Sequence, residues 1–89
     1  MSEKNTRSRA RLNMYRPAVF CLRVQGELGA NWAEYLSVRS MSVELDQDGC
    51  PVTVLTTDAV DQCALIGIIN HVNMLGMPLV SVECVLAER

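Results

Sequence analysis

Apolar and polar residues alternate along several stretches of the chain, which predicts β-strands with one buried face. Residues 18–26 place apolar side chains at every second position, and residues 38–45 do the same. Residues 46–49 contain Asp-Gly, a sequence that favours the positive φ angles of a tight hairpin turn. A third apolar stretch follows at 52–56. The second and third stretches are therefore predicted to form a β-hairpin.

A longer segment, from 61 or 62 to about 75, has the periodicity of a helix. Its apolar residues recur three and four positions apart, as on the buried face of a helix that packs against a sheet, at Leu65, Ile68, Ile69, Val72 and Leu75. Asp58 or Asp61 is placed to cap the first turn, and Gly76 to end the helix. Residues 79–86 then alternate as a fourth strand.

A short helix is predicted at 30–36, between the first two strands. Asn31 can cap it, and Trp32, Tyr35 and Leu36 lie three and four positions apart, so they share one side. The resulting β-α-β-β-α-β order predicts a ferredoxin-like split β-α-β fold of the α+β class. It would have an antiparallel four-stranded sheet with one long and one short helix on one face. The open face is expected to carry Cys21, Arg23, Ser40, Ser42, Glu44 and Thr53.

The 89 residues are 49% hydrophobic and 20% charged, a composition typical of a folded globular chain. Residues 1–16 hold five basic residues and one acid, whereas the remainder holds three arginines and nine acids. We therefore predict a flexible basic arm at 1–16 and a single domain at 17–89. Such an arm leaves nucleic-acid contact open. Because the body is acidic and no aromatic residues alternate with the arginines, nucleic acid is the less favoured partner.

The four cysteines are widely spaced and form no close ligand pair, at positions 21, 50, 63 and 84. Zinc sites usually contain such pairs, so we expect no metal, and no cofactor motif is present either. No apolar run reaches the ~20 residues of a membrane span, and no secretory apolar segment precedes the first strand. We therefore expect a cytoplasmic protein without a membrane partner, with its thiols free.

Few residues offer catalytic chemistry. The single histidine, His71, has no carboxylate three or four positions away on the predicted helix, so we expect a surface or interface role. Asp58, Asp61 and Glu83 are candidate carboxylates, but capping accounts for the two aspartates. Cys63 is the candidate reactive thiol, because the first turn of a helix favours the thiolate. The pattern leaves enzymatic activity open and favours a protein without it.

Three segments, taken in order, carry a resemblance to a known family. The first is 24–28, with a glycine, followed by Trp32. The second is 60–69, which contains D-Q-x-x-L-x-G on the predicted helix. The third is 75–82, which reads L-G-x-x-L-h-S-V, where h is apolar. Together, over about 19–83, they resemble a family of short uncharacterised bacterial proteins. Where many members have His before the helix glycine, this chain has Ile66. The resemblance implies no activity.

The predicted long helix has more apolar surface than one face of a sheet can bury. Large apolar side chains left in water favour association, so we expect a homo-oligomer, most simply a dimer. The candidate interface residues are Ile66, Asn70, Asn73 and Met74. A non-enzymatic interaction or regulatory module is the primary hypothesis, and residues 1–16 folding back over the helix is the alternative use of this surface. A second functional hypothesis is a small-molecule-binding or enzymatic dimer with a pocket lined by Trp32, Tyr35 and Met41.

Overall fold

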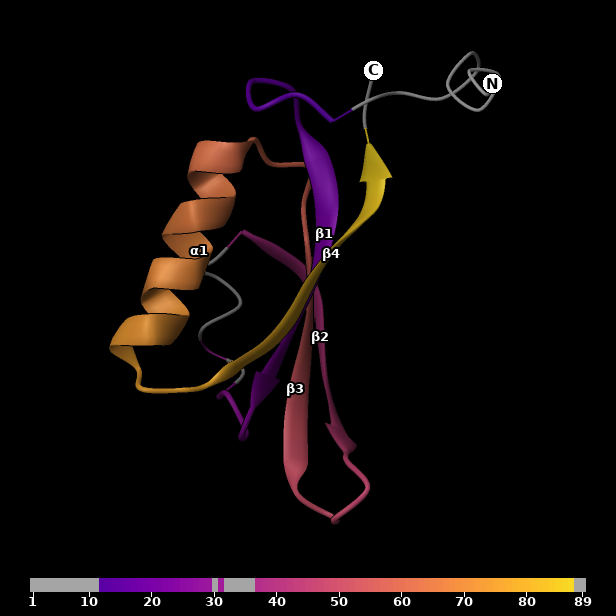
Figure 1. Cartoon of the computed structure of the whole chain (residues 1–89), viewed down its shortest axis with the longest axis vertical. Helices are drawn as coiled ribbons and strands as arrows, with labels where there is room; N and C mark the ends of the chain where they lie inside the picture. Colours follow the sequence, from indigo (N-terminus) through magenta and orange to yellow (C-terminus); the bar gives the residue numbers. More distant parts are fainter. Residues whose placement is uncertain (1–11, 30, 32–36, 88–89) are drawn as a thin grey trace.

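The computed structural model describes residues 12–29, 31 and 37–87. Its elements are β1 (Ala18–Gln25), β2 (Val38–Leu45), β3 (Pro51–Thr57), α1 (Gln62–Met74) and β4 (Leu79–Ala87). The strands form one antiparallel sheet in the order β2-β3-β1-β4, so two connections, β1 to β2 and β3 to β4, each pass over one strand. The helix lies along one face of this sheet (Figure 1).

The ferredoxin-like prediction is wrong. It required the order β-α-β-β-α-β with two helices, whereas the described residues have the order β-β-β-α-β with one helix. The four-stranded antiparallel sheet and the long helix were predicted correctly. The short helix predicted at 30–36 falls, apart from Asn31, outside the described residues. Seven residues make two helical turns at most, and apolar spacing over so short a stretch is weak support for a helix.

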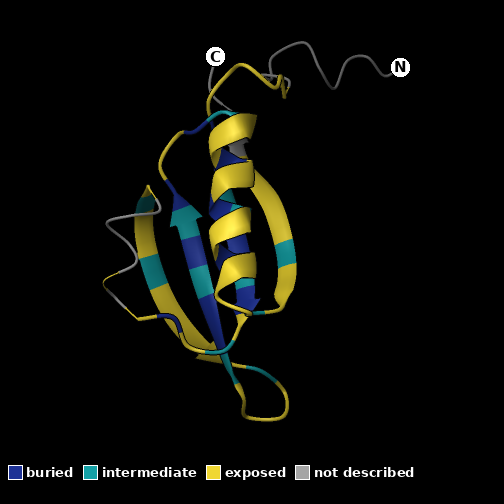
Figure 2. Ribbon diagram, turned by 90° about the vertical axis from the view of Figure 1, so that its left-hand side faces the viewer, coloured by how far each residue is buried: buried dark blue, intermediate teal, exposed yellow. Residues whose placement is uncertain are grey.

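The core lies between α1 and the two central strands. Leu22, Val24 and Leu55 of the sheet are fully buried. The helix contributes the buried side chains Leu65, Ile68 and Val72. Buried residues follow the two middle strands beneath the helix, whereas the outer strands β2 and β4 are mostly exposed (Figure 2). Each large aliphatic side chain buried in this way contributes about 1.5–3 kcal/mol to folding.

The ends of α1 agree closely with the prediction. Asp61 is the N-cap, and Gly76 has a φ of 74°, the left-handed conformation that glycine adopts most easily after a helix. The predicted apolar stripe is correct except at Leu75, which is 38% exposed. Leu75 is the C-cap residue, so it lies at the end of the helix, beyond the last buried helical residue, Val72.

Thr53 lies on the helix side of the sheet and not on the open face as predicted. Its partner across the sheet is Val24, and both are fully buried. Because side chains alternate along a strand, burying Leu55 forces Thr53 to the same side. The hydroxyl of Thr53 donates to the carbonyl of Gly26 at 2.7 Å and accepts from the amide of Leu28 at 3.0 Å. Thr53 therefore holds the start of the β1–β2 connection against the core.

We expect Thr53→Val to destabilise the fold by about 2–4 kcal/mol, because valine has the same shape but leaves a buried amide and a carbonyl without their partner. Thr56→Val is the matched control, since Thr56 lies on the same strand, half-buried on the opposite face. We expect a change within about 0.5 kcal/mol there. Urea unfolding followed by circular dichroism measures both, and equal effects would contradict this role of Thr53.

Candidate interaction surface on helix α1 and strand β4

The four predicted interface residues are all exposed on α1, but they do not share one flank of the helix. Ile66 is 47% exposed and Met74 is 84% exposed, with Asn70 and Asn73 between them. Ile66 borders a hollow that also contains Phe20 of β1. Met74 borders a different hollow, of about 400 Å³, together with Ser37 next to β2. The two large apolar side chains therefore border hollows on different flanks of α1.

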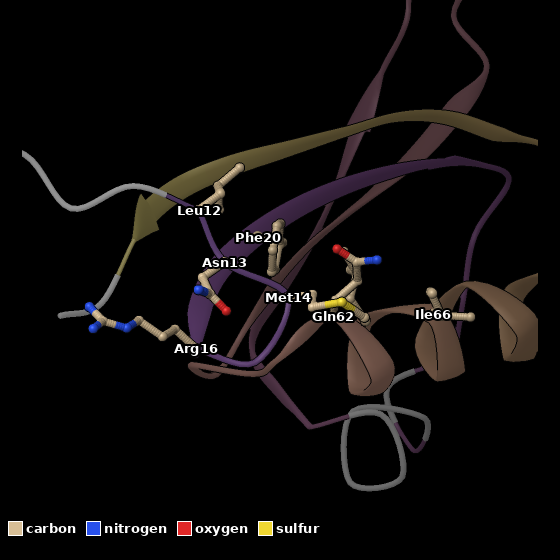
Figure 3. A pocket seen from close by; sticks show the side chains of 8 residues that line it. Leu12, Asn13, Met14, Arg16, Phe20, Gln62 and Ile66 are labelled. Carbon is tan, nitrogen blue, oxygen red and sulfur yellow. The ribbon is translucent and has the colours of Figure 1, made fainter. Parts of the chain in front are cut away.

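The hollow beside Ile66 has a volume of about 340 Å³ and lies between the first half of α1 and the segment 12–16 (Figure 3). Its lining is Leu12, Asn13, Met14, Arg16, Phe20, Gln62, Leu65 and Ile66. The backbone amide of Gln62 donates to the carbonyl of Met14 at 3.2 Å. The described end of the predicted arm thus contacts the start of the helix. The extent of a flexible arm stays a prediction, because residues 1–11 lie outside the described part.

A second hollow, of about 280 Å³, continues on this flank near the end of α1. It is bordered by Ile69 and Asn73 of the helix and by Leu79, the first residue of β4. Ile66 in the first hollow stands three and seven positions before Ile69 and Asn73 in the second, so the two hollows lie along one flank of α1. Leu79 shows that this flank faces the edge strand.

Strand β4 leaves an apolar surface in contact with solvent, which we call the β4 edge and define by the residues Leu79, Val80, Val82 and Val85. Val82 pairs with the buried Leu22 and so faces the helix side, yet it is 37% exposed. Val80 and Val85 are 57% and 59% exposed. In the described residues β4 pairs with β1 alone. Alternation along the sequence identified this strand but not its place at the edge, so the β4 edge was missed.

The open face of the sheet carries an ion pair. Arg23 of β1 reaches across β3 and donates to Glu44 of β2 at 2.8 Å. This hydrogen bond, together with the charge of Glu44, raises the pKa of Arg23 above its ordinary value. Both side chains are largely solvent-exposed, so the pair contributes little to stability. The contact shows that the Arg23 side chain is long enough to reach across the neighbouring strand, β3, to β2.

The predicted pocket is only partly described. Trp32 and Tyr35 lie outside the described residues. Met41 is half-buried on β2 and packs against the core. None of the three hollows at the helix is lined by Met41. The pocket therefore stays a prediction.

The candidate catalytic residues are dispersed. Cys63 is exposed in the first turn of α1, and all four cysteines are free thiols. The ring nitrogen Nδ1 of His71 lies 3.3 Å from the carbonyl oxygen of Gly67, one turn earlier. Asp58 is exposed, 3.9 Å from Arg39. Glu83 lies on β4, opposite Cys21. Within the described ranges, no three His, Cys, Asp or Glu side chains gather closely enough to hold a metal ion.

Comparison with protein-family models places most of the chain in a family. Residues 19–83 match the family model described as Domain of unknown function (DUF8691). The chain belongs to this family. No curated protein and no solved structure matches the chain. In the described part of this DUF8691 protein, no helix is long and apolar enough to cross a membrane.

The extent of the DUF8691 match bears on the candidate surface. It runs from Val19 in β1 to Glu83 in β4, so it includes all of α1 and the first half of the edge strand. Residues 12–16, which close the larger hollow, lie before the match. The helix and edge strand are therefore part of the family domain, whereas the wall formed by 12–16 is outside it.

Between the two candidate caps of α1, the structure selects Asp61, whose Oδ1 accepts from the amide of Ala64 at 2.9 Å. We expect Asp61→Ala to lower the free energy of unfolding by about 1 kcal/mol, and Asp61→Asn to lower it less, because asparagine is also a good N-cap. Asp58→Ala is the control and is expected to change stability by less than about 0.5 kcal/mol, since its contact is exposed. Thermal unfolding of the three variants tests this order, and a larger loss at Asp58 would refute it.

Proposed function

We propose that the protein is a non-enzymatic interaction module that acts as a homodimer. The observation that supports this proposal most is the exposure of large apolar side chains on α1 and on the edge strand β4. Ile66 on the helix and Val80 and Val82 on the edge strand are between 37% and 57% exposed. Large apolar side chains exposed on regular secondary structure often mark protein–protein contacts. Dispersed catalytic groups give an enzyme less support.

The flank of α1 that faces β4 is the better candidate for the contact than the flank with Met74. It joins helix and strand, and its two hollows are lined mainly by apolar residues. A partner that inserted side chains there would bury Ile66 together with Val82. Asn70 and Asn73 would border such a contact and offer hydrogen bonds at its rim, where polar residues are common.

Two alternatives have weaker support. The hollow beside Ile66 is large enough for a small ligand, but its polar residues, Asn13, Gln62 and Arg16, are exposed. Binding of nucleic acid would depend mainly on the basic residues of 1–11, outside the described part of the chain. Deleting residues 1–11 would abolish such binding if it exists. A cytoplasmic location is part of the proposal, and four free thiols are compatible with a reducing compartment.

Sedimentation velocity over a range of protein concentrations tests the proposal directly. We expect a dimer at tens of micromolar, and we expect Ile66→Asp to raise the dimer dissociation constant about tenfold or more, because a buried isoleucine contributes about 1.5–3 kcal/mol. Met74→Asp is the matched control on the other flank of the same helix, and we expect it to have the smaller effect. A wild-type protein that stays monomeric at these concentrations would refute the proposed function.

A further inference from the structure

The two edges of the sheet differ in a way that bears on how the protein self-associates. Exposed edge strands present unpaired backbone groups, and proteins usually protect them with charged residues or proline. The other edge, β2, contains Arg39 and Glu44. Between Leu79 and Val85, β4 contains neither lysine nor proline and only one charge, Glu83. The β4 edge is therefore the less protected of the two.

We infer that β4 pairs antiparallel with β4 of a second copy around a two-fold axis at Val82, joining two sheets into one of eight strands. This inference rests on the proposed homodimer and specifies its geometry. Each backbone group on the outer side of the central part of β4 would gain a partner from the second copy. Both helices would then lie on the same face of the joined sheet, one on each side of the paired β4 strands.

The register follows from the bulges of β4. Its pairing with β1 is irregular at Val80 and Val85 and regular between them, from Ser81 to Cys84. Residues directly opposite each other in a sheet point to the same face. In a symmetric antiparallel pair, the two-fold axis must therefore pass through a position where one residue lies opposite the same residue of the second copy. Within the regular stretch the axis can pass through the middle positions, Val82 or Glu83. At Glu83 it would place two carboxylates opposite each other, which is unfavourable. Val82 is the remaining choice.

Charges on the open face support the same register. With the axis at Val82, Glu83 lies opposite Ser81 of the second copy, and Ser81 is itself paired with Arg23. Each Glu83 is then two strands from the Arg23 of the other copy. In the single chain Arg23 reaches Glu44, which lies two strands away on the β2 side, so its side chain is long enough for such a distance but would have to turn toward β4. In the dimer each Glu83 would then have an arginine of the other copy within reach on the open face.

The helix side of the joined strands supports the register as well. Val82, 37% exposed in the single chain, would lie against its own copy on this face. Because α1 covers the central strands, it leaves the outer side of β4 open, where the strand of the second copy would lie. Burial of two valines and pairing of the backbone would stabilise the dimer together, as in other proteins that bind by adding a strand to a sheet edge.

Val82→Lys tests the axis, because it places two ammonium groups opposite each other. Val43→Lys is the matched control, since Val43 is also a valine on the helix side of an edge strand, 46% exposed, but on β2. We expect Val82→Lys to raise the dimer dissociation constant about tenfold or more. We expect Val43→Lys to change it by less than about twofold from the wild-type value. Circular dichroism checks that both variants are folded.

A charge exchange tests the register. Glu83→Lys should weaken the dimer about tenfold by facing Arg23 of the other copy, and adding Arg23→Glu should restore most of the affinity. Arg23→Glu alone should also weaken it. Failure of the double variant to recover, when both single variants are weakened and folded, would overturn the register.

Hydrogen exchange on the wild-type protein tests the edge without any substitution. We expect amides of 80–85 to become protected as the concentration rises through the dimer dissociation constant, and amides of β2 to remain unchanged. A monomer at all concentrations refutes both the proposed function and this inference. A wild-type dimer that shows no protection in β4, and that Val82→Lys leaves intact, overturns the β4 pairing while the homodimer stands.

Discussion

In the described part of the chain, a single helix lies on a four-stranded sheet, and the other features of this protein follow from that constraint. An α-helix with its side chains is about 10–12 Å wide, and neighbouring strands are about 4.8 Å apart. One helix therefore covers about two strands. In this chain those are β1 and β3, whose inward residues Leu22 and Leu55 are fully buried. The outer strands keep half-exposed apolar residues on the same face, at Val43 and Val82.

The narrow core explains why polar groups take part in it. Thr53 and Thr57 are completely buried beneath the helix, and each hydroxyl accepts a hydrogen bond from a backbone amide, at Leu28 and Phe20 respectively. The two hydroxyls therefore satisfy backbone amides near the start of β1 and just after its end, which lets threonine occupy the core without an unpaired polar group.

The sequence predicts the elements well and their environment less well. Apolar alternation identifies the strands, and Asp61 and Gly76 locate the ends of α1, since caps are local interactions between neighbours in the chain. The side of Thr53 and the position of β4 at an edge depend on which strands become neighbours. That arrangement results from contacts between distant segments, so periodicity cannot supply it. The ferredoxin-like class was wrong, and its second helix rested on only four residues of 30–36, a stretch that apart from Asn31 lies outside the described residues.

The same limit applies to the candidate site. Ile66 and Met74 are two turns apart in sequence and were grouped on one interface, but the hollows that they border lie toward β4 and β2 respectively. The sequence alone does not reveal that Val80 and Val82 are exposed at an edge and belong to the candidate surface, because alternating apolar residues also occur in strands buried between two others. What distinguishes β4 is a combination of features: an unpaired side in the described fold, two bulges that limit regular pairing to four residues, and a lone acid.

These features act together in the proposed dimer. The bulges at Val80 and Val85 limit how far a foreign strand can extend along β4, and Glu83 excludes the register that would align it with itself. An edge of this kind restricts pairing to a short antiparallel contact and opposes continued strand addition, which is the hazard of an unprotected edge. Since each copy has one such edge and the other edge carries Arg39 and Glu44, association would stop at two. The incomplete coverage by α1 therefore leads to a closed dimer and not to a fibre.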